Sequence, residues 1–236
     1  GLQNLSLGNK KLSLLSTALP SLPHIKELNL ANNNLSRQSL DELFRAMKPM
    51  QTITSLNLNR NKVSRSCLSS LAHLLLSKGN QIESVFLKGC GIGNRGIKSF
   101  STTLLDNSPS GKMRHLLELD LQKNNIVSCS YLVDLLPHLK CLGTLNLAWN
   151  PIKGKEASKI ASVCHSSTDI KRLSFAWGPL FPCESPEVYA EFGRLIECSR
   201  TLAWLDLSCT GFSKVSCLAE GIASNRTLKH LSLSNN

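Results

Sequence analysis

The stretch Gly91-Ile-Gly93-Asn-Arg-Gly96 has the spacing of a phosphate-binding glycine motif, G-x-G-x-x-G. It follows the apolar segment Val85–Leu87 and precedes a segment with helical periodicity. This is the order found in dinucleotide-binding units, whose glycines let a pyrophosphate approach the start of a helix. The acidic residue that ends a second strand of such a unit is missing, however, and similar segments recur on both sides. We therefore interpret these glycines as a turn within a repeat, and we predict no bound cofactor.

The other residues that could carry catalytic or metal chemistry are dispersed. The six histidines lack the spacing of a metal site, and neither a nucleophile elbow nor a His-Glu-x-x-His motif occurs. Asp120 and Asp206 hold equivalent positions three repeats apart, roughly 14–15 Å at the strand spacing of a sheet, which is too far for a cooperating carboxylate pair. The nine cysteines are scattered and better explained as small buried side chains. We predict no catalytic residue, no metal site and an intracellular protein, cytoplasmic or nuclear.

A repeated pattern, L-x-x-L-x-L-x-x-N-x-L, organises the chain, and Ile25–Leu35 is its clearest copy. The spacing between copies averages about 28 residues, a period typical of a solenoid. We number the pattern from position one to position eleven. Positions four to six predict a short strand, and the change of apolar period from 2 to 3.6 after position eleven predicts a helix. The nine copies begin at Leu2, Ile25, Ile53, Ile82, Leu116, Leu142, Ile170, Leu202 and Leu228.

The ninth position is asparagine in most copies, and stacked copies should form a ladder of backbone hydrogen bonds. We expect this ladder to loosen where another residue replaces the asparagine, namely at Lys10, Cys90, Gly178 and Thr210. The first interval is only 23 residues, which predicts an opening strand at Leu2–Leu7 and too little room for a regular helix before Ile25.

A strand and a full helix in about 28 residues resembles the ribonuclease-inhibitor-like class of leucine-rich repeat. This class also occurs in the GTPase-activating protein for Ran, in innate-immune receptors with nucleotide-binding domains and in large scaffolds. The resemblance covers residues 1–236, which we treat as one domain. It implies an α/β horseshoe of about eight to nine repeats, with parallel strands on the concave face and helices on the convex face. Both ends fall inside the repeat pattern, so we expect a part of a larger protein.

The repeat register predicts which side chains point out of the concave face: those at positions two, three, five, seven and eight. All three tryptophans hold such positions. Trp149 and Trp177 occupy position eight of consecutive repeats, so their rings should lie side by side, and Trp204 occupies position three of the next. Phe86 adds an aromatic ring at position five, nearer the N-terminus. The leucine framework requires no indole here, and exposed indoles are typical of binding hot spots.

An alternative is that the rings only cover neighbouring apolar edges or shield the long connection Pro179–Pro186, which could equally form a lip for a ligand. If the face binds a partner, we expect polar concave side chains to orient that partner: Asn146, Asp120, Asp206 and Arg172.

The charge is unevenly distributed. The formal net charge is +11, but charges on the concave positions nearly cancel. Positions ten to fourteen, in the turns after the strands, hold basic residues and no acidic ones. An edge that carries only positive charge raises the rate of encounter with acidic partners. Alternatively, these charges serve only to keep the protein soluble. We call these residues the basic rim: Lys11, Arg37, Lys62, Arg65, Arg95, Lys153, Lys155 and Lys214.

The sequence thus predicts a non-enzymatic protein–protein interaction module that binds its partner on the concave face, and the basic rim suits an acidic partner. A chromatin- or nucleic-acid-associated scaffold module that uses the basic rim is an alternative, less favoured because the concave charge is mixed and the aromatic rings are confined to one end. Further alternatives are a ligand-sensing or regulatory array of a larger receptor, or a spacer. No apolar run reaches the roughly 18 residues of a membrane span, so we expect no membrane contact.

Overall fold

The computed structural model describes residues 1–107, 115–180 and 185–236. Across these residues, strands of three residues form one parallel sheet whose spatial order is the chain order. Equivalent positions face each other in every pair, as Leu28 faces Leu56, so the repeats stack in phase. The strands are β1 (Glu27–Asn29), β2 (Ser55–Asn57), β3 (Ser84–Phe86), β4 (Glu118–Asp120), β5 (Thr144–Asn146), β6 (Arg172–Ser174), β7 (Trp204–Asp206) and β8 (His230–Ser232).

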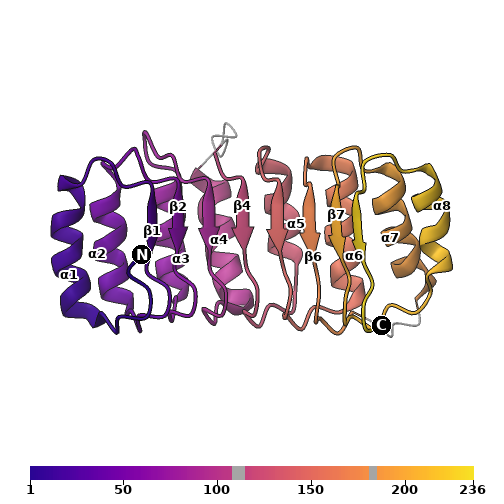
Figure 1. Ribbon diagram of the computed structural model, residues 1–236, viewed down its shortest axis with the longest axis horizontal. Coiled ribbons are helices and arrows are strands. Elements are labelled where there is room, and N and C mark those ends of the chain that lie inside the picture. Colours follow the sequence, from indigo (N-terminus) through magenta and orange to yellow (C-terminus); the bar gives the residue numbers. More distant parts are fainter. Residues whose placement is uncertain (108–114, 181–184) are drawn as a thin grey trace.

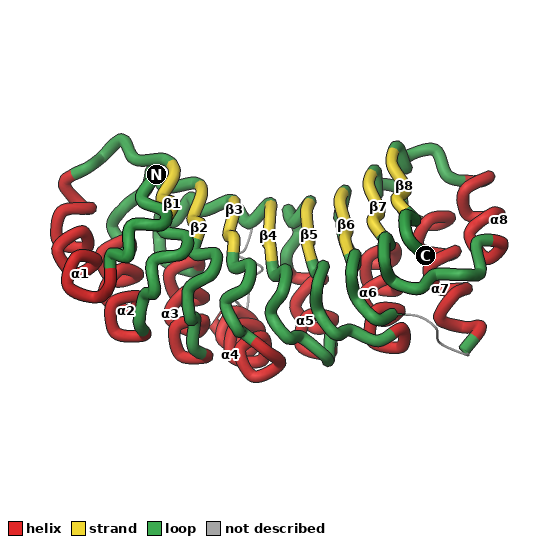
Figure 2. The backbone as a smooth tube through the Cα atoms, turned by 60° about the horizontal axis from the view of Figure 1, so that its bottom comes forward, coloured by secondary structure: helices red, strands yellow, loops and turns green. Residues whose placement is uncertain are grey.

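The helices form a second layer on one side of the sheet (Figure 1). The molecule curves so that the strands lie on the inner face and the helices on the outer face (Figure 2). The predicted α/β repeat solenoid is therefore confirmed. The helices are α1 (Gly8–Ala18), α2 (Arg37–Met47), α3 (Arg65–Leu75), α4 (Gly93–Asn107), α5 (Ser130–Leu135), α6 (Gly154–Ser167), α7 (Pro186–Cys198) and α8 (Ser216–Ser224), with short 3-10 turns η1 (Leu19–Ser21) and η2 (Leu136–His138).

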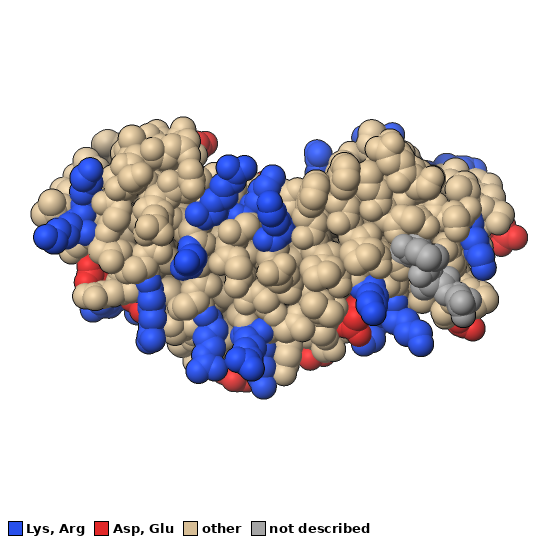
Figure 3. Space-filling model, turned by 90° about the horizontal axis from the view of Figure 1, so that it is seen from below, with Lys and Arg blue, Asp and Glu red and all other residues tan. Residues whose placement is uncertain are grey.

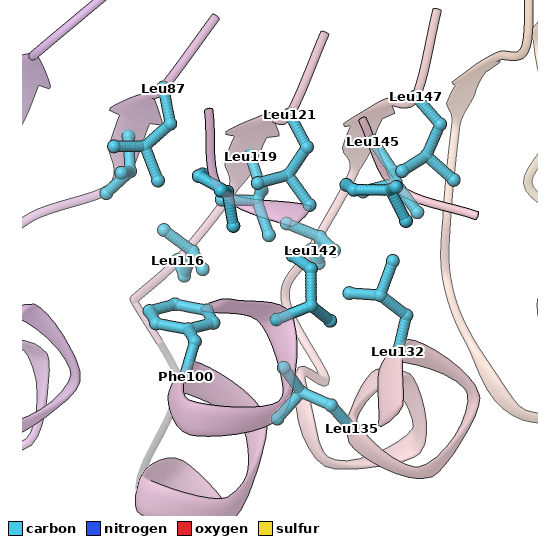
Figure 4. Close-up of a cluster of buried hydrophobic side chains, with 14 of the residues drawn as sticks. Leu87, Phe100, Leu116, Leu119, Leu121, Leu132, Leu135, Leu142, Leu145 and Leu147 are labelled. Carbon is cyan, nitrogen blue, oxygen red and sulfur yellow. The ribbon is translucent and has the colours of Figure 1, made fainter. Parts of the chain in front are cut away.

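Leucines at positions one, four, six and eleven fill the space between the two layers. In the central repeats, Leu119 and Leu121 point from β4 and its continuation toward Phe100 of α4 (Figure 4). These side chains are 2 % exposed or less. Since positions three and five alternate with these buried positions along a strand, their side chains must leave the opposite, concave face.

The predicted register of the first repeat is wrong. The N–H of Leu2 donates to Asn29 O (2.9 Å) and that of Asn4 donates to Ala31 O (3.0 Å), bonds that positions six and eight make in later repeats. Leu2 therefore holds position six, 28 residues before its equivalent Leu30, and no strand forms at the start of the chain. The unit has its full length, and α1 supplies the regular helix that the shorter interval seemed to exclude.

The asparagine ladder is built as expected where position nine is asparagine. Asn33, Asn61, Asn124 and Asn150 are 1 % exposed or less. In Asn124, Oδ1 accepts the N–H of Cys90 (2.9 Å), and Nδ2 donates to the carbonyls of Leu87 and Leu121 (2.8 and 3.0 Å). One side chain thus ties two adjacent repeats together through buried backbone groups that need partners.

The ladder changes where position nine departs from asparagine. The Sγ of Cys90 donates to Leu58 O at 3.3 Å, and Thr210 Oγ1 donates to Leu207 O at 2.7 Å. Gly178 has no side chain that could accept a backbone N–H of the preceding repeat. Lys10 is not at position nine in the corrected register. Leu5 holds that place and is 50 % exposed.

Candidate functional site

Position eight of every repeat adopts a left-handed backbone conformation. Its φ lies between 54° and 66° throughout, from Asn32 (55°) through Gly89 (66°) to Asn235 (57°). Glycine and asparagine adopt this conformation readily, whereas other L-residues are strained in it. Trp149 (φ 59°) and Trp177 (φ 60°) nevertheless occupy this position in consecutive repeats. Hydrogen bonds from their N–H groups to the next repeat, at 2.8 and 2.9 Å, hold the backbone there.

The rings of Trp149 and Trp177 are stacked, as the register predicts. Their centroids are 4.6 Å apart and their planes 12° from parallel. They are 46 % and 52 % exposed, so the pair stands on the concave face and is not packed into the core. Stacking of this kind contributes about 0.5–1.5 kcal/mol, which offsets part of the backbone strain.

Trp204 lies in a second stack, across three neighbouring strands. On one side, the Arg172 guanidinium of β6 lies 5.2 Å from the centroid of the Trp204 ring. On the other side, the His230 ring of β8 is stacked on Trp204, with centroids 5.6 Å apart and planes 8° from parallel. The three residues share position three, where β6, β7 and β8 pair in register. Arg172 and Trp204 were predicted site residues. His230 was missed, although the same positional rule identifies it.

A hollow of about 480 Å³ separates the two stacks, and we call it the tryptophan cleft. Small residues form its floor: Ala148 and Ala176 at position seven and Ser174 at position five. The flanking indoles project past these short side chains and so deepen the surface. Glu118 is among the residues that line the cleft. All predicted concave-face residues except Phe86 line it too: Asp120, Asn146, Trp149, Arg172, Trp177, Trp204 and Asp206. Phe86 lies on β3, outside it.

Position five has a structural task that asparagine performs in several repeats. The Asn29, Asn57 and Asn146 Oδ1 atoms each accept the N–H two residues ahead, at 3.0–3.1 Å. Asp120 and Asp206 make the same bond, at 2.9 and 3.0 Å. Because asparagine suffices for this bond, the backbone does not require a negative charge at either place.

Burial raises the pKa of the Asp120 carboxyl above its ordinary value, and a backbone hydrogen bond and nearby Lys88 partly oppose that rise. The cleft also contains Glu118 and Asp206, against the single cation Arg172. Asp120 and Asp206 are three strand spacings apart, as predicted from the repeats. The cleft therefore offers separate polar contacts along its length.

The basic rim lies at the edge where strands end and helices begin. All eight of its residues are exposed. Arg37 and Arg65 are the first residues of α2 and α3, and Arg95, Lys153 and Lys155 lie at the starts of α4 and α6. Figure 3 shows this edge, where Lys and Arg side chains are spread along the molecule. The placement of Lys11 in a turn after a strand is wrong, since the corrected register puts it inside α1.

Other chemistry suggested by the sequence is not assembled in the described parts of the chain. Gly91 lies in the turn before α4, and Gly93 is the first residue of that helix. No group of three or more His, Cys, Asp or Glu side chains in these parts could hold a metal ion. The tip of the Pro179–Pro186 connection, proposed as a lip, lies outside the described residues. No described helix has the length and apolar character needed to cross a membrane.

Comparison with known proteins gives two matches to repeat families. A Leucine Rich Repeat model matches residues 24–46, and a second leucine-rich repeat model matches residues 112–127. No curated protein matches the chain.

Among solved structures, the chain is similar to the tropomodulin C-terminal domain of Caenorhabditis elegans, at 10 % identity over 91 % of this chain and 93 % of that one, with a TM-score of 0.36. It is also similar to leiomodin-1 actin-binding site 2, at 13 % identity over 88 % and 87 %, with a TM-score of 0.29. Such low TM-scores support no inference about a partner.

Proposed function

Since the chain is a leucine-rich repeat protein, we propose that it is a non-enzymatic protein–protein interaction module whose partner lies across the concave face. The tryptophan cleft anchors that partner, with Asp120, Asn146, Arg172 and Asp206 setting its orientation. We assign the repeats to the ribonuclease-inhibitor-like class, because a helix follows a short parallel strand in units of about 28 residues.

The observation that carries this proposal is the strained, half-exposed tryptophan pair. Both rings occupy a left-handed backbone position that costs about 1–2 kcal/mol for residues other than glycine. About half of each ring surface faces solvent. Neither feature helps the isolated fold, whereas both help a binding surface: strained residues cluster at functional sites, and tryptophans dominate binding hot spots.

The basic rim acts at longer range in this proposal. Its charge attracts an acidic surface of the partner and speeds encounter, while the cleft makes the close contacts. Reversing Arg37, Arg65 and Arg95 to Glu should then slow association more than it speeds dissociation, and the effect should shrink as salt is raised. If the native chain instead binds DNA or RNA and the triple reversal abolishes that binding, the rim binds nucleic acid.

The test of the anchor is Trp149→Asn with Trp177→Asn, because asparagine suits the position-eight backbone, as at Asn32. Partner captured by the immobilised native chain is identified, and its affinity for each variant is then measured. Truncation of a hot spot costs about 2 kcal/mol or more, so affinity should fall at least about thirtyfold. Cys209→Asn, at position eight of the next repeat, is the matched control. Equal affinity of the double variant and this control would overturn the proposal.

A further inference from the structure

A second hollow of the concave face lies on the other side of Trp149, and it is lined by cations. We call it the basic hollow. It has a volume of about 340 Å³ and is lined by Arg60, Lys88, Gly89, Gln122, Lys123 and Trp149. Its three cations come from three consecutive repeats and belong to neither the basic rim nor the tryptophan cleft. Gln122 and Trp149 line both hollows.

The three cations of the basic hollow form no salt bridge within the described residues, although Lys88 interacts electrostatically with Asp120 of the neighbouring cleft. No acidic residue lines it. None of Arg60, Lys88 and Lys123 takes part in the ion pairs found within 4.0 Å in the described chain. Arg60 and Lys123 also hold position eight in the left-handed conformation, both with φ 57°. The chain thus places like charges together, in strained backbone, where asparagine would serve the fold better.

Gly89 keeps the basic hollow open between the two outer cations. It holds position eight of the middle repeat, with φ +66°, and an added Cβ there would meet only the Arg60 side chain, at 3.8 Å. Any longer side chain would enter the hollow. The backbones of Arg60 and Lys123 are two strand spacings apart, roughly 9.6 Å. Their long side chains can reach one small anion from opposite sides, with Lys88 between them.

We propose that the basic hollow binds a phosphate group carried on a side chain of the protein partner; this rests on the proposed function. A phosphorylated side chain carries about −1.5 to −2 charge and three strong acceptor oxygens. An arginine fork can bond two of these oxygens, and two lysines supply further charge-assisted donors. A single carboxylate has less charge and fewer acceptors for the three cations.

The surroundings favour a phosphorylated protein over nucleic acid. The tryptophan cleft, which adjoins the basic hollow at Gln122 and Trp149, contains Glu118, Asp120 and Asp206. A nucleic-acid strand that set one phosphate on the basic hollow and continued along the face would bring further phosphates over these carboxylates. A peptide carries a single phosphate and can place a neutral or basic side chain there instead. Because Trp149 is a shared wall, the phosphorylated residue and the side chain in the tryptophan cleft should be near neighbours in the partner.

The test uses degenerate peptides with one fixed phosphoserine, phosphothreonine or phosphotyrosine, and their unphosphorylated twins. Binding to the native chain is followed by fluorescence anisotropy. We expect at least a tenfold preference for the phosphorylated peptides. In ¹⁵N-labelled protein, inorganic phosphate alone should shift the amide signals of Gly89 and Lys123 and the indole signal of Trp149, and leave that of Trp204 unmoved.

The informative variant is Arg60→Asn with Lys123→Asn, because asparagine suits the backbone of position eight and removes both charges. It should lose the preference for phosphate. Lys26→Asn with Lys229→Asn removes the same net charge from exposed concave residues outside the hollow and should keep the preference. Absence of a preference, or a preference that survives Arg60→Asn with Lys123→Asn, overturns the proposal. The proposal is also overturned if the native chain binds single-stranded or duplex DNA more tightly than the phosphorylated peptides and Arg60→Asn with Lys123→Asn abolishes that DNA binding.

Trp177→Asn separates this proposal from the proposed function, because Trp177 lines only the tryptophan cleft. This variant should keep the shifts caused by inorganic phosphate while losing affinity for the partner. If the phosphate experiments fail and the tryptophan variants still lose the partner, only the phosphate inference falls. If phosphate binds and the tryptophan variants keep the partner, only the anchoring role falls.

Discussion

Replacing Asn150 with alanine should destabilise the solenoid directly beneath the tryptophan pair. Asn150 is 1 % exposed and adjoins the strained Trp149. Its Oδ1 accepts the N–H groups of Asn124 and Ile126, at 2.9 and 3.1 Å. Its Nδ2 donates to the carbonyls of Leu121 and Leu147, both at 2.9 Å.

The magnitude follows from which buried groups lose their partners. Leu121 O keeps a bond from Asn124 Nδ2, but Leu147 O has no second ladder asparagine, because position nine of the next repeat is Gly178. The two N–H groups can partly recover. Where Cys90 replaces asparagine, the N–H of Asn61 turns to Leu58 O at the longer distance of 3.3 Å. A buried group without a partner costs about 1–3 kcal/mol. One lost and two weakened bonds give about 2–4 kcal/mol.

The assay is urea unfolding of the variant, followed by far-ultraviolet circular dichroism and tryptophan fluorescence, since a solenoid can unfold in more than one step. Cys90→Ala is the matched control at the same position. It removes a small thiol with a weak hydrogen bond and should cost only about 1 kcal/mol. A loss below about 1 kcal/mol for Asn150→Ala, or one no larger than that of the control, would show that the ladder does not stabilise this junction.

Three further predictions concern titratable groups whose pKa is raised by burial. Asp120→Asn keeps the acceptor that Gln122 N–H needs, but should weaken partner binding; unchanged affinity would remove Asp120 from the site. Since burial raises the pKa of this carboxyl, its charge opposes folding above that pKa and ceases to do so as the pH falls through it. The variant should therefore be the more stable one at neutral pH, with a gap that narrows in acid, as urea titrations at several pH values will show. Burial also raises the pKa of Cys90, Cys129 and Cys164 to about 12, so these thiols should resist iodoacetamide at pH 8 while exposed Cys141 and Cys198 react. Peptide mass spectrometry measures this, and equal labelling of both groups would contradict it.

The repeat register accounts for most of what could be predicted. It placed the strands and put the three indoles on the concave face, because alternation along a strand leaves no other choice once the leucines are buried. It failed at Leu2-Gln-Asn-Leu5-Ser-Leu7, because leucines three and then two residues apart fit positions six, nine and eleven as well as positions one, four and six. Only the left-handed backbone at Asn4 and the hydrogen bonds of the ladder decide between the phases.

The depth of the cleft and the division of charge could not be predicted from side-chain direction alone. The cleft depends on short side chains, Ala148 and Ala176, lying beside long ones. A nearly balanced concave charge concealed two regions of opposite sign, because summing over the face discards the order of the residues. Arg60, Lys88 and Lys123 line the basic hollow, whereas Glu118 and Asp120, from the same repeat as Lys123, line the tryptophan cleft with Asp206.

The positions that depart from asparagine support the proposed binding face. At positions five and eight the backbone needs what asparagine supplies: an acceptor for the N–H two residues ahead, and tolerance of a positive φ. The end repeats use asparagine for one or both tasks, at Asn29, Asn32 and Asn235. Several inner repeats replace it, with Arg60 and Lys123, with Trp149 and Trp177, and with Asp120 and Asp206, although Asn146 keeps it at position five. Each replacement at position eight by a residue other than glycine costs on the order of 1 kcal/mol. Packing does not offset that cost, because the side chains placed there are largely exposed, and this supports our proposal that the concave face binds a partner.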